Sequence, residues 1–149
     1  MCALLLAQSS GRRRCGGADY GWDMIDSAIE PLGLHHVSIN VRNTVESVAF
    51  YTGVLGLTVR DDRPDFSFGG AWLDIGGQQV HLIEAVVPAD CGQHVAIWVA
   101  DIDAAVTALR QRGVEVSDPK PVASSRQCFL RDPSGNLIEL HEPSISIGV

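Results

Sequence analysis

The sequence lacks a long apolar run, a surplus of basic residues and a closely spaced pair of cysteines. No stretch reaches the roughly 18 consecutive apolar residues that cross a bilayer. The apolar run 3–7 is too short for a signal peptide and has no basic residue before it. We therefore expect no membrane segment and a cytoplasmic protein.

The charge and the cysteines narrow the class of protein further. Acidic residues outnumber basic ones by 18 to 11, and the net charge of −7 argues against nucleic acid, which favours clustered lysine and arginine. The four cysteines show no C-x-x-C spacing, so we expect a reducing compartment and no disulfide framework. They are Cys2, Cys15, Cys91 and Cys128. For Cys128 we expect a packed thiol rather than a nucleophile, because no obvious base lies near it in the sequence.

The chain divides into a tail and a domain. Residues 1–30 show no sustained periodicity and predict a flexible tail, in which Met24 is a plausible alternative start. The 149 residues are enough for one well-cored domain or for two small modules that share a core. We expect a single domain over residues 31–145.

Residues 93–105 predict a half-buried strand that leads into a capped helix. Val95, Ile97 and Val99 alternate with more polar or differently sized residues, which is the period-two pattern of a strand with two different faces. Asp101 is a candidate N-cap, and apolar residues then recur at helical spacing until Gly113.

The same unit occurs earlier, at residues 35–49. When His36 is aligned with His94, the apolar positions of the two strands coincide. His81 follows His36 by 45 residues, and Glu139 follows His94 by the same interval. The chain is therefore expected to hold two copies of one module, at 34–85 and 93–142.

Glycine, proline and aspartate divide both modules into a βαβββ order, which predicts an α+β fold. In the first module we expect strands 34–41, 57–60, 66–75 and 78–84, with a helix from Asn43 to about Gly53. In the second we expect strands 94–99, 114–116, 126–131 and 136–141, with a helix over 102–112. The loops are expected at 61–65, 86–92 and 118–121, and tight turns at Gly76-Gly77 and at Asp132-Pro133-Ser134-Gly135.

Three motifs give the chain a resemblance to the vicinal-oxygen-chelate superfamily, which includes glyoxalase I, methylmalonyl-CoA epimerase, extradiol dioxygenases and fosfomycin-resistance proteins. The motifs are Leu34-His35-His36-Val37-Ser38-Ile39-Asn40-Val41, Ala49-Phe50-Tyr51 followed by Val54-Leu55-Gly56-Leu57, and Asp132-Pro133-Ser134-Gly135-Asn136-Leu137-Ile138-Glu139-Leu140. The resemblance covers about residues 34–142. It implies that the two modules curl into a partly open, barrel-like cup around one divalent metal.

The resemblance also implies which side chains hold that metal. His36 and His94 match the ligands on the first strand of each module, and Glu139 matches the glutamate of the final strand. His81 lies where members of the superfamily vary, with glutamate common in glyoxalase I and glutamine in the epimerases.

Strand alternation is consistent with this site. His36, Ser38 and Asn40 share one face of their strand, and His94 shares a face with Trp98. Three imidazoles and one carboxylate suit Zn, Ni, Co, Fe or Mn better than Ca or Mg. Four protein ligands leave an octahedral ion two positions for water or for two neighbouring substrate oxygens.

The expected activity is that of a metal-dependent lyase or isomerase. Its substrate would be a small oxygenated metabolite, such as a thioester or a thiol conjugate, and the metal would stabilise an enolate. Glu139 is the candidate base. A metal-bound His81 is a much poorer base than a glutamate, which counts against glyoxalase I itself. The alternatives are an extradiol dioxygenase or a fosfomycin-type thiol transferase, both with three-ligand sites, and a metal-free binding or resistance protein.

Outside the metal site, we expect some residues to contact the substrate and others to lie in the core. Trp98, His141, Asn40 and Arg126 are candidates for contact with the small-molecule substrate. His35 is expected to be an ordinary partly buried histidine. Trp72, Phe66 and Phe68 could line a substrate pocket, but we expect them in the core, where strand aromatics usually lie. We expect a homodimer, because the open sheet edges need cover. Whether a site lies within one chain or is shared between two is left open.

Overall fold

The structure of the chain is a computed structural model that describes residues 30–144. All the elements below belong to the compact unit that begins at Gly33. The predictions for the tail before residue 30, including Met24, Cys2 and Cys15, lie outside the described residues. The domain limits of 31 and 145 stay a prediction.

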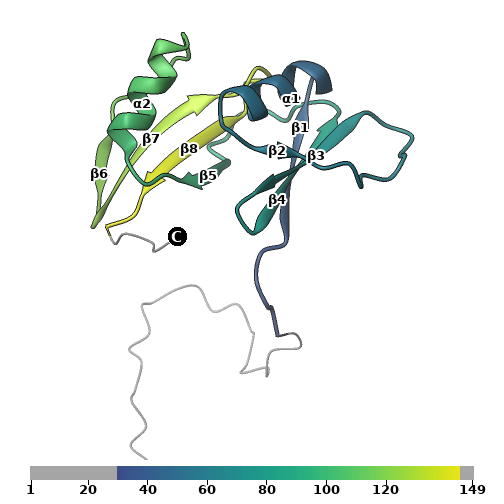
Figure 1. The fold of residues 1–149 in the computed structure, drawn as a ribbon, viewed down its shortest axis with the longest axis horizontal. Coiled ribbons are helices and arrows are strands. Elements are labelled where there is room, and N and C mark those ends of the chain that lie inside the picture. The colour runs from purple at the N-terminus through teal and green to yellow at the C-terminus, as the bar shows by residue number, and fades with distance from the viewer. Residues whose placement is uncertain (1–29, 145–149) are drawn as a thin grey trace, which may run out of the picture. The chain divides into compact units, whose positions relative to one another are not determined.

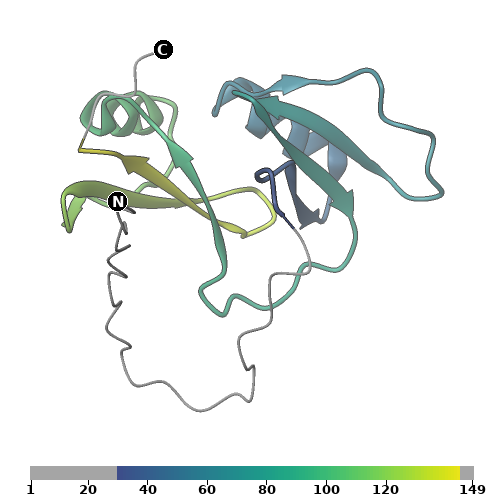
Figure 2. The same ribbon diagram turned by 90° about the horizontal axis from the view of Figure 1, so that it is seen from below.

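Two four-stranded mixed sheets, each with one helix, make up the fold, and the α+β prediction is confirmed (Figures 1 and 2). The first module contains β1 (His36–Val41), α1 (Thr44–Gly53), β2 (Thr58–Val59), β3 (Gly70–Ile75) and β4 (Gln78–Glu84). The second contains β5 (His94–Trp98), α2 (Ile102–Gln111), β6 (Lys120–Val122), β7 (Ser125–Arg131) and β8 (Leu137–Glu142). Neither sheet closes into a barrel.

The strand order is the same in both sheets. It is β1-β4-β3-β2 in the first and β5-β8-β7-β6 in the second, so the first strand of each module pairs in parallel with its last. The other pairs are antiparallel. The repeat seen in the sequence is therefore a repeat of topology.

Both helices begin at the residues predicted to cap them. Asn43 accepts a hydrogen bond from the backbone N–H of Glu46, and Asp101 accepts one from that of Ala104. The helices pack on the apolar faces of the sheets. One cluster of buried residues, among them Val41, Leu82 and Ile138, runs through both modules.

Two of the predicted strands differ from the structure. The strand expected over 66–75 begins only at Gly70, because Phe66 and Phe68 belong to a loop that Arg63 holds by donating from Nη2 to the carbonyl of Phe68 (2.8 Å). The prediction of a strand over 114–116 was also wrong, since Val116 makes an isolated bridge to Leu130 and no strand forms there. The edge strand β6 (Lys120–Val122) instead overlaps the end of the predicted loop 118–121, and Pro121 is tolerated there because an edge strand has one side without a partner.

The predicted turn at 132–135 joins the two modules. Asp132 is buried and accepts from the backbone N–H groups of Ser134 and Asn136 (both 2.8 Å) and from the hydroxyl of Tyr51 on α1 (3.1 Å). The Ser134 hydroxyl accepts from the backbone N–H of Arg42 (2.9 Å). Side chains of this turn therefore contact α1 and the loop between β1 and α1 in the first module.

Among residues 30–144, no helix is long and apolar enough to cross a membrane.

Candidate functional site

The four predicted metal ligands form two pairs, one on each sheet. The imidazoles of His36 and His81 stack with ring centroids 4.1 Å apart and planes 13° apart. On the other sheet, Nε2 of His94 lies 3.1 Å from Oε2 of Glu139. Each pair joins the first strand of a module to its last, as the parallel pairing requires.

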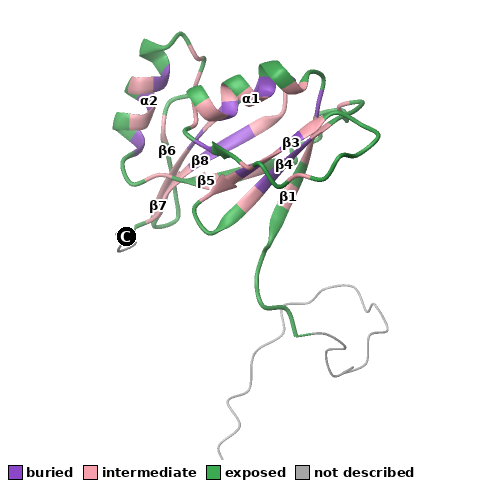
Figure 3. Cartoon of the chain, turned by 45° about the vertical axis from the view of Figure 1, so that its right-hand side comes forward, coloured by how far each residue is buried: buried purple, intermediate pink, exposed green. Residues whose placement is uncertain are grey.

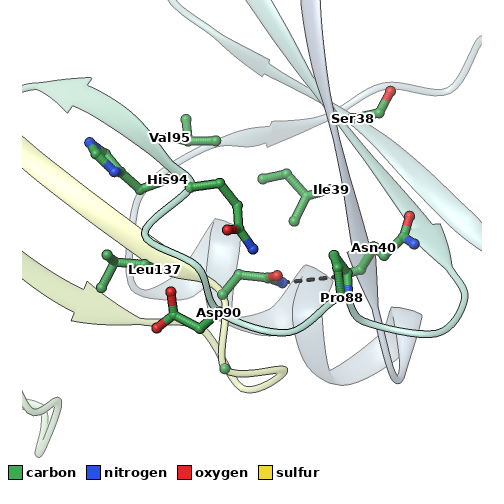
Figure 4. Close-up of a pocket in the computed structure, with 11 residues that line it drawn as sticks. Ser38, Ile39, Asn40, Pro88, Asp90, His94, Val95 and Leu137 are labelled. Carbon is green, nitrogen blue, oxygen red and sulfur yellow. Dashed lines mark hydrogen bonds between the residues drawn. The ribbon is translucent and has the colours of Figure 1, made fainter.

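One chain does not gather these pairs into a single cluster. Within residues 30–144, no group of three or more His, Cys, Asp or Glu side chains is arranged to hold a metal ion. In Figure 4 the ring of His94 points away from Ile39 of β1. A single chain therefore presents two half-sites, while the assignment of the four ligands stays a prediction.

His94 and Glu139 have the donor chemistry of metal ligands. Nδ1 of His94 lies 2.9 Å from the carbonyl oxygen of Gly92, so this nitrogen carries the proton. In the neutral ring, Nε2 then presents a lone pair to the carboxylate of Glu139, and two acceptors face each other. A cation between them, or a second proton on His94, resolves this contact. Metal-binding histidines commonly donate their other ring nitrogen to a backbone carbonyl, as His94 does.

His141 holds the second oxygen of Glu139. Its Nδ1 lies 2.8 Å from Oε1 of the buried carboxylate and donates to it. Glu139 thus has one oxygen toward His94 and the other toward His141. The carboxylate orientation is fixed from both sides.

In the first half-site, one ring nitrogen of each histidine is within hydrogen-bond distance of another side chain. Nδ1 of His36 lies 2.8 Å from Nδ1 of His35, and Nε2 of His81 donates to Oε1 of Gln79 (2.8 Å). This leaves Nε2 of His36 and Nδ1 of His81 available. Burial lowers the pKa of His81, and the neighbouring His36, His35 and Arg60 lower it further. His81 is therefore held toward the neutral form that a metal ligand requires.

The predicted substrate contacts lie in different surroundings, and all four stay predictions. Trp98 is 70% exposed on the face of β5 that carries His94. Asn40 donates from Nδ2 to the carbonyl of Val86 in the linker (2.8 Å). Arg126 points to the other face of its sheet, where it pairs with Asp103 on α2 (2.7 Å) and with Glu142 (3.4 Å).

Two aromatic rings on the ligand faces are additions to the predicted contacts. Trp72, which was expected in the core, stacks on His81 with centroids 4.4 Å apart and planes 11° apart. Phe129 meets the ring of His94 edge-on at 5.6 Å. Register explains both, because Trp72 pairs directly with His81 and Phe129 with Glu139. Strand alternation applied to β3 and β7 would have placed both aromatic side chains beside the ligands.

A cavity of about 320 Å³ lies between β1 and the start of β5 (Figure 4). Ile39 and Val95 line it, and Pro88 and Asp90 of the linker contribute as well. Of the four predicted ligands only His94 borders it. The cavity is therefore a gap between modules and not the place where the two half-sites meet.

Comparison with known proteins gives consistent matches. The chain is 32% identical to the uncharacterized protein YaeR of Escherichia coli (strain K12) over 122 residues, which are 73% of this chain and 95% of that protein. It is 30% identical to the lactoylglutathione lyase of Salmonella typhimurium over 123 residues, 73% of this chain and 91% of that one. A crystal structure of a glyoxalase family protein from Bacillus anthracis superposes with a TM-score of 0.68 at 26% identity, covering 77% of this chain and 98% of the other.

The family comparison covers both half-sites. Residues 33–140 match the Glyoxalase/Bleomycin resistance protein/Dioxygenase superfamily as a whole. This range contains both modules and all four predicted ligands. The chain belongs to the Glyoxalase/Bleomycin resistance protein/Dioxygenase superfamily.

Proposed function

We propose that this protein is a metal-dependent lyase or isomerase of the glyoxalase type. The metal centre would be assembled by two copies of the chain, with His36 and His81 from one copy and His94 and Glu139 from the other. The ion would be Zn, Ni, Co, Fe or Mn, which suit three imidazoles and a carboxylate. The substrate is a small metabolite with two neighbouring oxygens.

The facing pair of His94 Nε2 and Glu139 Oε2, 3.1 Å apart, is the observation that carries the proposal. A lone pair and a carboxylate oxygen at this distance attract a cation. The pair is half of a ligand set, and the other half is on a different sheet of the same chain.

The exposure of the ligand faces supports a shared centre. His36 and Ser38 on β1 are exposed, as are His94 and Trp98 on β5. Both strands end their sheets, since β1 pairs with β4 and β5 with β8. Open edges of this kind invite a partner strand. A second copy that places its β5 beside β1 would bring a complete set of four ligands together on each side of a symmetric dimer.

The chemistry follows from the charges of the site. A bound divalent ion acts as a Lewis acid that stabilises negative charge on the substrate oxygens. Glu139 accepts the proton that leaves the carbon beside the carbonyl. His141 donates to Oε1 of that carboxylate and so keeps its orientation. Trp72 and Phe129 border the histidines and supply the apolar surface beside the proposed metal.

The proposed site holds a single carboxylate, and this bears on the reaction. His81 occupies the second position where a base could stand, and a metal-bound imidazole is a poor proton acceptor. Glu139 must then both remove and return the proton. One base on one face of the substrate favours an isomerase or lyase other than glyoxalase I itself, whereas an epimerase needs a second proton donor on the opposite face.

Metal analysis of the purified full chain tests the proposal. After reconstitution with Zn, Ni, Co or Mn we expect about one ion per chain, as one set of four ligands per chain requires. We expect Glu139→Ala to weaken binding by at least about 100-fold, because loss of a ligand costs more than loss of an outer partner. Glu115→Ala, which removes an exposed acid, is the matched control.

Two outcomes would count against it. Less than about one-tenth of an equivalent of metal in the reconstituted wild type favours the metal-free binding proteins. Full metal content in His81→Ala favours a three-ligand site of the dioxygenase or thiol-transferase kind.

A further inference from the structure

Five aromatic rings follow one another from His36 of the first half-site to Phe68 in an exposed loop. His36 stacks on His81 at 4.1 Å, and His81 on Trp72 at 4.4 Å. Trp72 lies 6.2 Å from Phe66, which is parallel to Phe68 at 5.1 Å with planes 6° apart. We call Trp72, Phe66 and Phe68 the aromatic row.

The outer end of the row is open. Phe66 is 39% exposed and Phe68 44% exposed, in a loop between β2 and β3 that is exposed along most of its length (Figure 3). The guanidinium of Arg63 lies over both rings, and the exposed remainder of the two phenylalanines is a surface on which a further planar group can stack. The inner end touches a predicted metal ligand, so a molecule held at the metal has the row beside it.

The loop that carries Phe66 and Phe68 has contacts that fix its conformation. Nη2 of Arg63 donates to the carbonyl of Phe68 (2.8 Å), and its guanidinium carbon lies 4.9 Å from the centre of the Phe66 ring. Gly70 follows at a point where a Cβ would overlap the carbonyl oxygen of Leu82. The rings are thus presented by a fixed loop, which limits the entropy lost when a ligand stacks on them.

The charges around the row disfavour an anion. Segment 60–68 has three aspartates and two arginines. Arg60 is paired with Asp62 (2.5 Å) and Asp74 (2.8 Å), and Arg63 donates to backbone carbonyls. Arg60 is thus held by carboxylates and Arg63 by backbone carbonyls, and three aspartates against two arginines leave the segment with one excess negative charge. A carboxylate-rich group such as glutathione would meet excess negative charge here.

We propose that the substrate carries an uncharged aromatic ring beyond its metal-binding oxygens, and that this ring stacks on Phe66 and Phe68. This inference rests on the proposed metal-dependent function and names the substrate class for that site. Phe66 and Phe68 determine specificity, and they have no part in the proton transfer.

A pair of hydroxamates tests the inference without a known substrate. Benzohydroxamate and acetohydroxamate both chelate a metal through two neighbouring oxygens, and only the first has a ring. Each is titrated by calorimetry into the cobalt-loaded full chain, and their affinities for free cobalt in the same buffer give the baseline. We expect the wild type to prefer benzohydroxamate by about tenfold beyond that baseline, the gain expected from stacking and partial burial of one ring.

Substitutions test whether the preference for benzohydroxamate depends on Phe66 and Phe68. In the double variant Phe66→Ala/Phe68→Ala the preference falls to within about twofold of baseline, while acetohydroxamate binds as in the wild type. Val45→Ala, which truncates another exposed apolar side chain, keeps the preference. We expect 4-carboxybenzohydroxamate to bind more weakly than benzohydroxamate, and added salt to narrow the difference.

The outcomes separate this inference from the function on which it rests. If neither hydroxamate binds the cobalt-loaded protein, the metal function and the inference both fail. If both bind with only the baseline difference, the metal function stands and the aromatic inference is overturned. It is also overturned if the double variant changes the sedimentation coefficient and leaves the preference intact, because the two rings would then cover a contact between subunits.

Discussion

The carboxylate of Asp132 accepts four hydrogen bonds from described residues, one from Ser134 in its own turn, two from Asn136 directly after the turn and one from Tyr51 on α1. Two of these donors are backbone N–H groups, of Ser134 and Asn136, and the carboxylate gives them the acceptor that a tight turn does not otherwise provide. The sequence alone identified this segment as a turn, and it could not show the link to Tyr51, which lies 81 positions away. Contacts of that separation depend on tertiary packing and not on a local pattern.

Tyr51→Phe is expected to lower the free energy of unfolding by about 1–2 kcal/mol, because it deletes a buried hydrogen bond to a charged group. Urea denaturation measures this. Asp132→Asn provides the partner for a double-mutant cycle. A Tyr51→Phe effect of the same size with and without Asp132→Asn would contradict the assigned contact.

The same hydroxyl predicts a loss of stability in alkali. Burial raises the pKa of Tyr51 well above the ordinary value of 10.0, and the charge of Asp132 and the hydrogen bond to it raise the pKa further. The unfolded chain therefore loses this proton before the folded one does. The stabilisation is present in full below about pH 10 and falls as the pH rises above it. Denaturation at a series of pH values should show this decline in the wild type and a smaller one in Tyr51→Phe.

Ser47 is a buried polar group of α1 whose hydroxyl has no partner among the described residues. Ser47→Ala removes that unsatisfied group and places a better helix former in the helix. We expect the free energy of unfolding to rise by about 1 kcal/mol, measured as a higher urea midpoint with an unchanged m-value. An equal or lower midpoint would show that the hydroxyl is satisfied in solution.

At the level of helices and strands, alternation and capping predicted most of the fold. β1, β4, β5 and β8 and both helices were predicted from apolar spacing and from Asn43 and Asp101. The errors fall where tertiary hydrogen bonds outweigh local preference. Phe66 and Phe68 have strand propensity, yet Arg63 holds their loop away from the ladder. Pro121 suggested a loop, yet an edge position accommodates it.

A substitution at Gly70 tests how closely the end of that loop packs against β4. Gly70→Ala would place a Cβ against the carbonyl oxygen of Leu82 on β4, where neither backbone can move without breaking the pairing of β3 and β4. We expect a loss of about 1–3 kcal/mol in the free energy of unfolding. Gly77→Ala, where a Cβ meets nothing within 4 Å, is the matched control. Equal effects of the two substitutions would refute the steric explanation.

At the level of the whole molecule, the sequence predicted which four residues form the proposed site but not how they come together. The internal repeat identified matching positions in two modules, and the pairs His36–His81 and His94–Glu139 are what that repeat produces in one chain. Which copy of the second module meets which copy of the first depends on association between chains. No local pattern encodes that choice.

Mixing inactive variants distinguishes a shared site from one within a single chain. A chain with His36→Ala and His81→Ala, and another with His94→Ala and Glu139→Gln, should each bind metal poorly. After unfolding and refolding together in equal amounts, half of the dimers are mixed, and one of their two sites is intact. We expect about a quarter of the wild-type metal content. No recovery in sedimenting mixed dimers would place each site within one chain.

The parallel pairing of β1 with β4 and of β5 with β8 also governs how the chain can fold as it leaves the ribosome. In each module the strand made first waits for the strand made last, so a half-synthesised module has no place to dock its opening histidine strand. The first module can close once residue 84 has emerged, whereas the second must wait for residues 137–142. A ribosome stalled between these two points would therefore carry one finished sheet and, beside it, a segment that still exposes its apolar residues to chaperones.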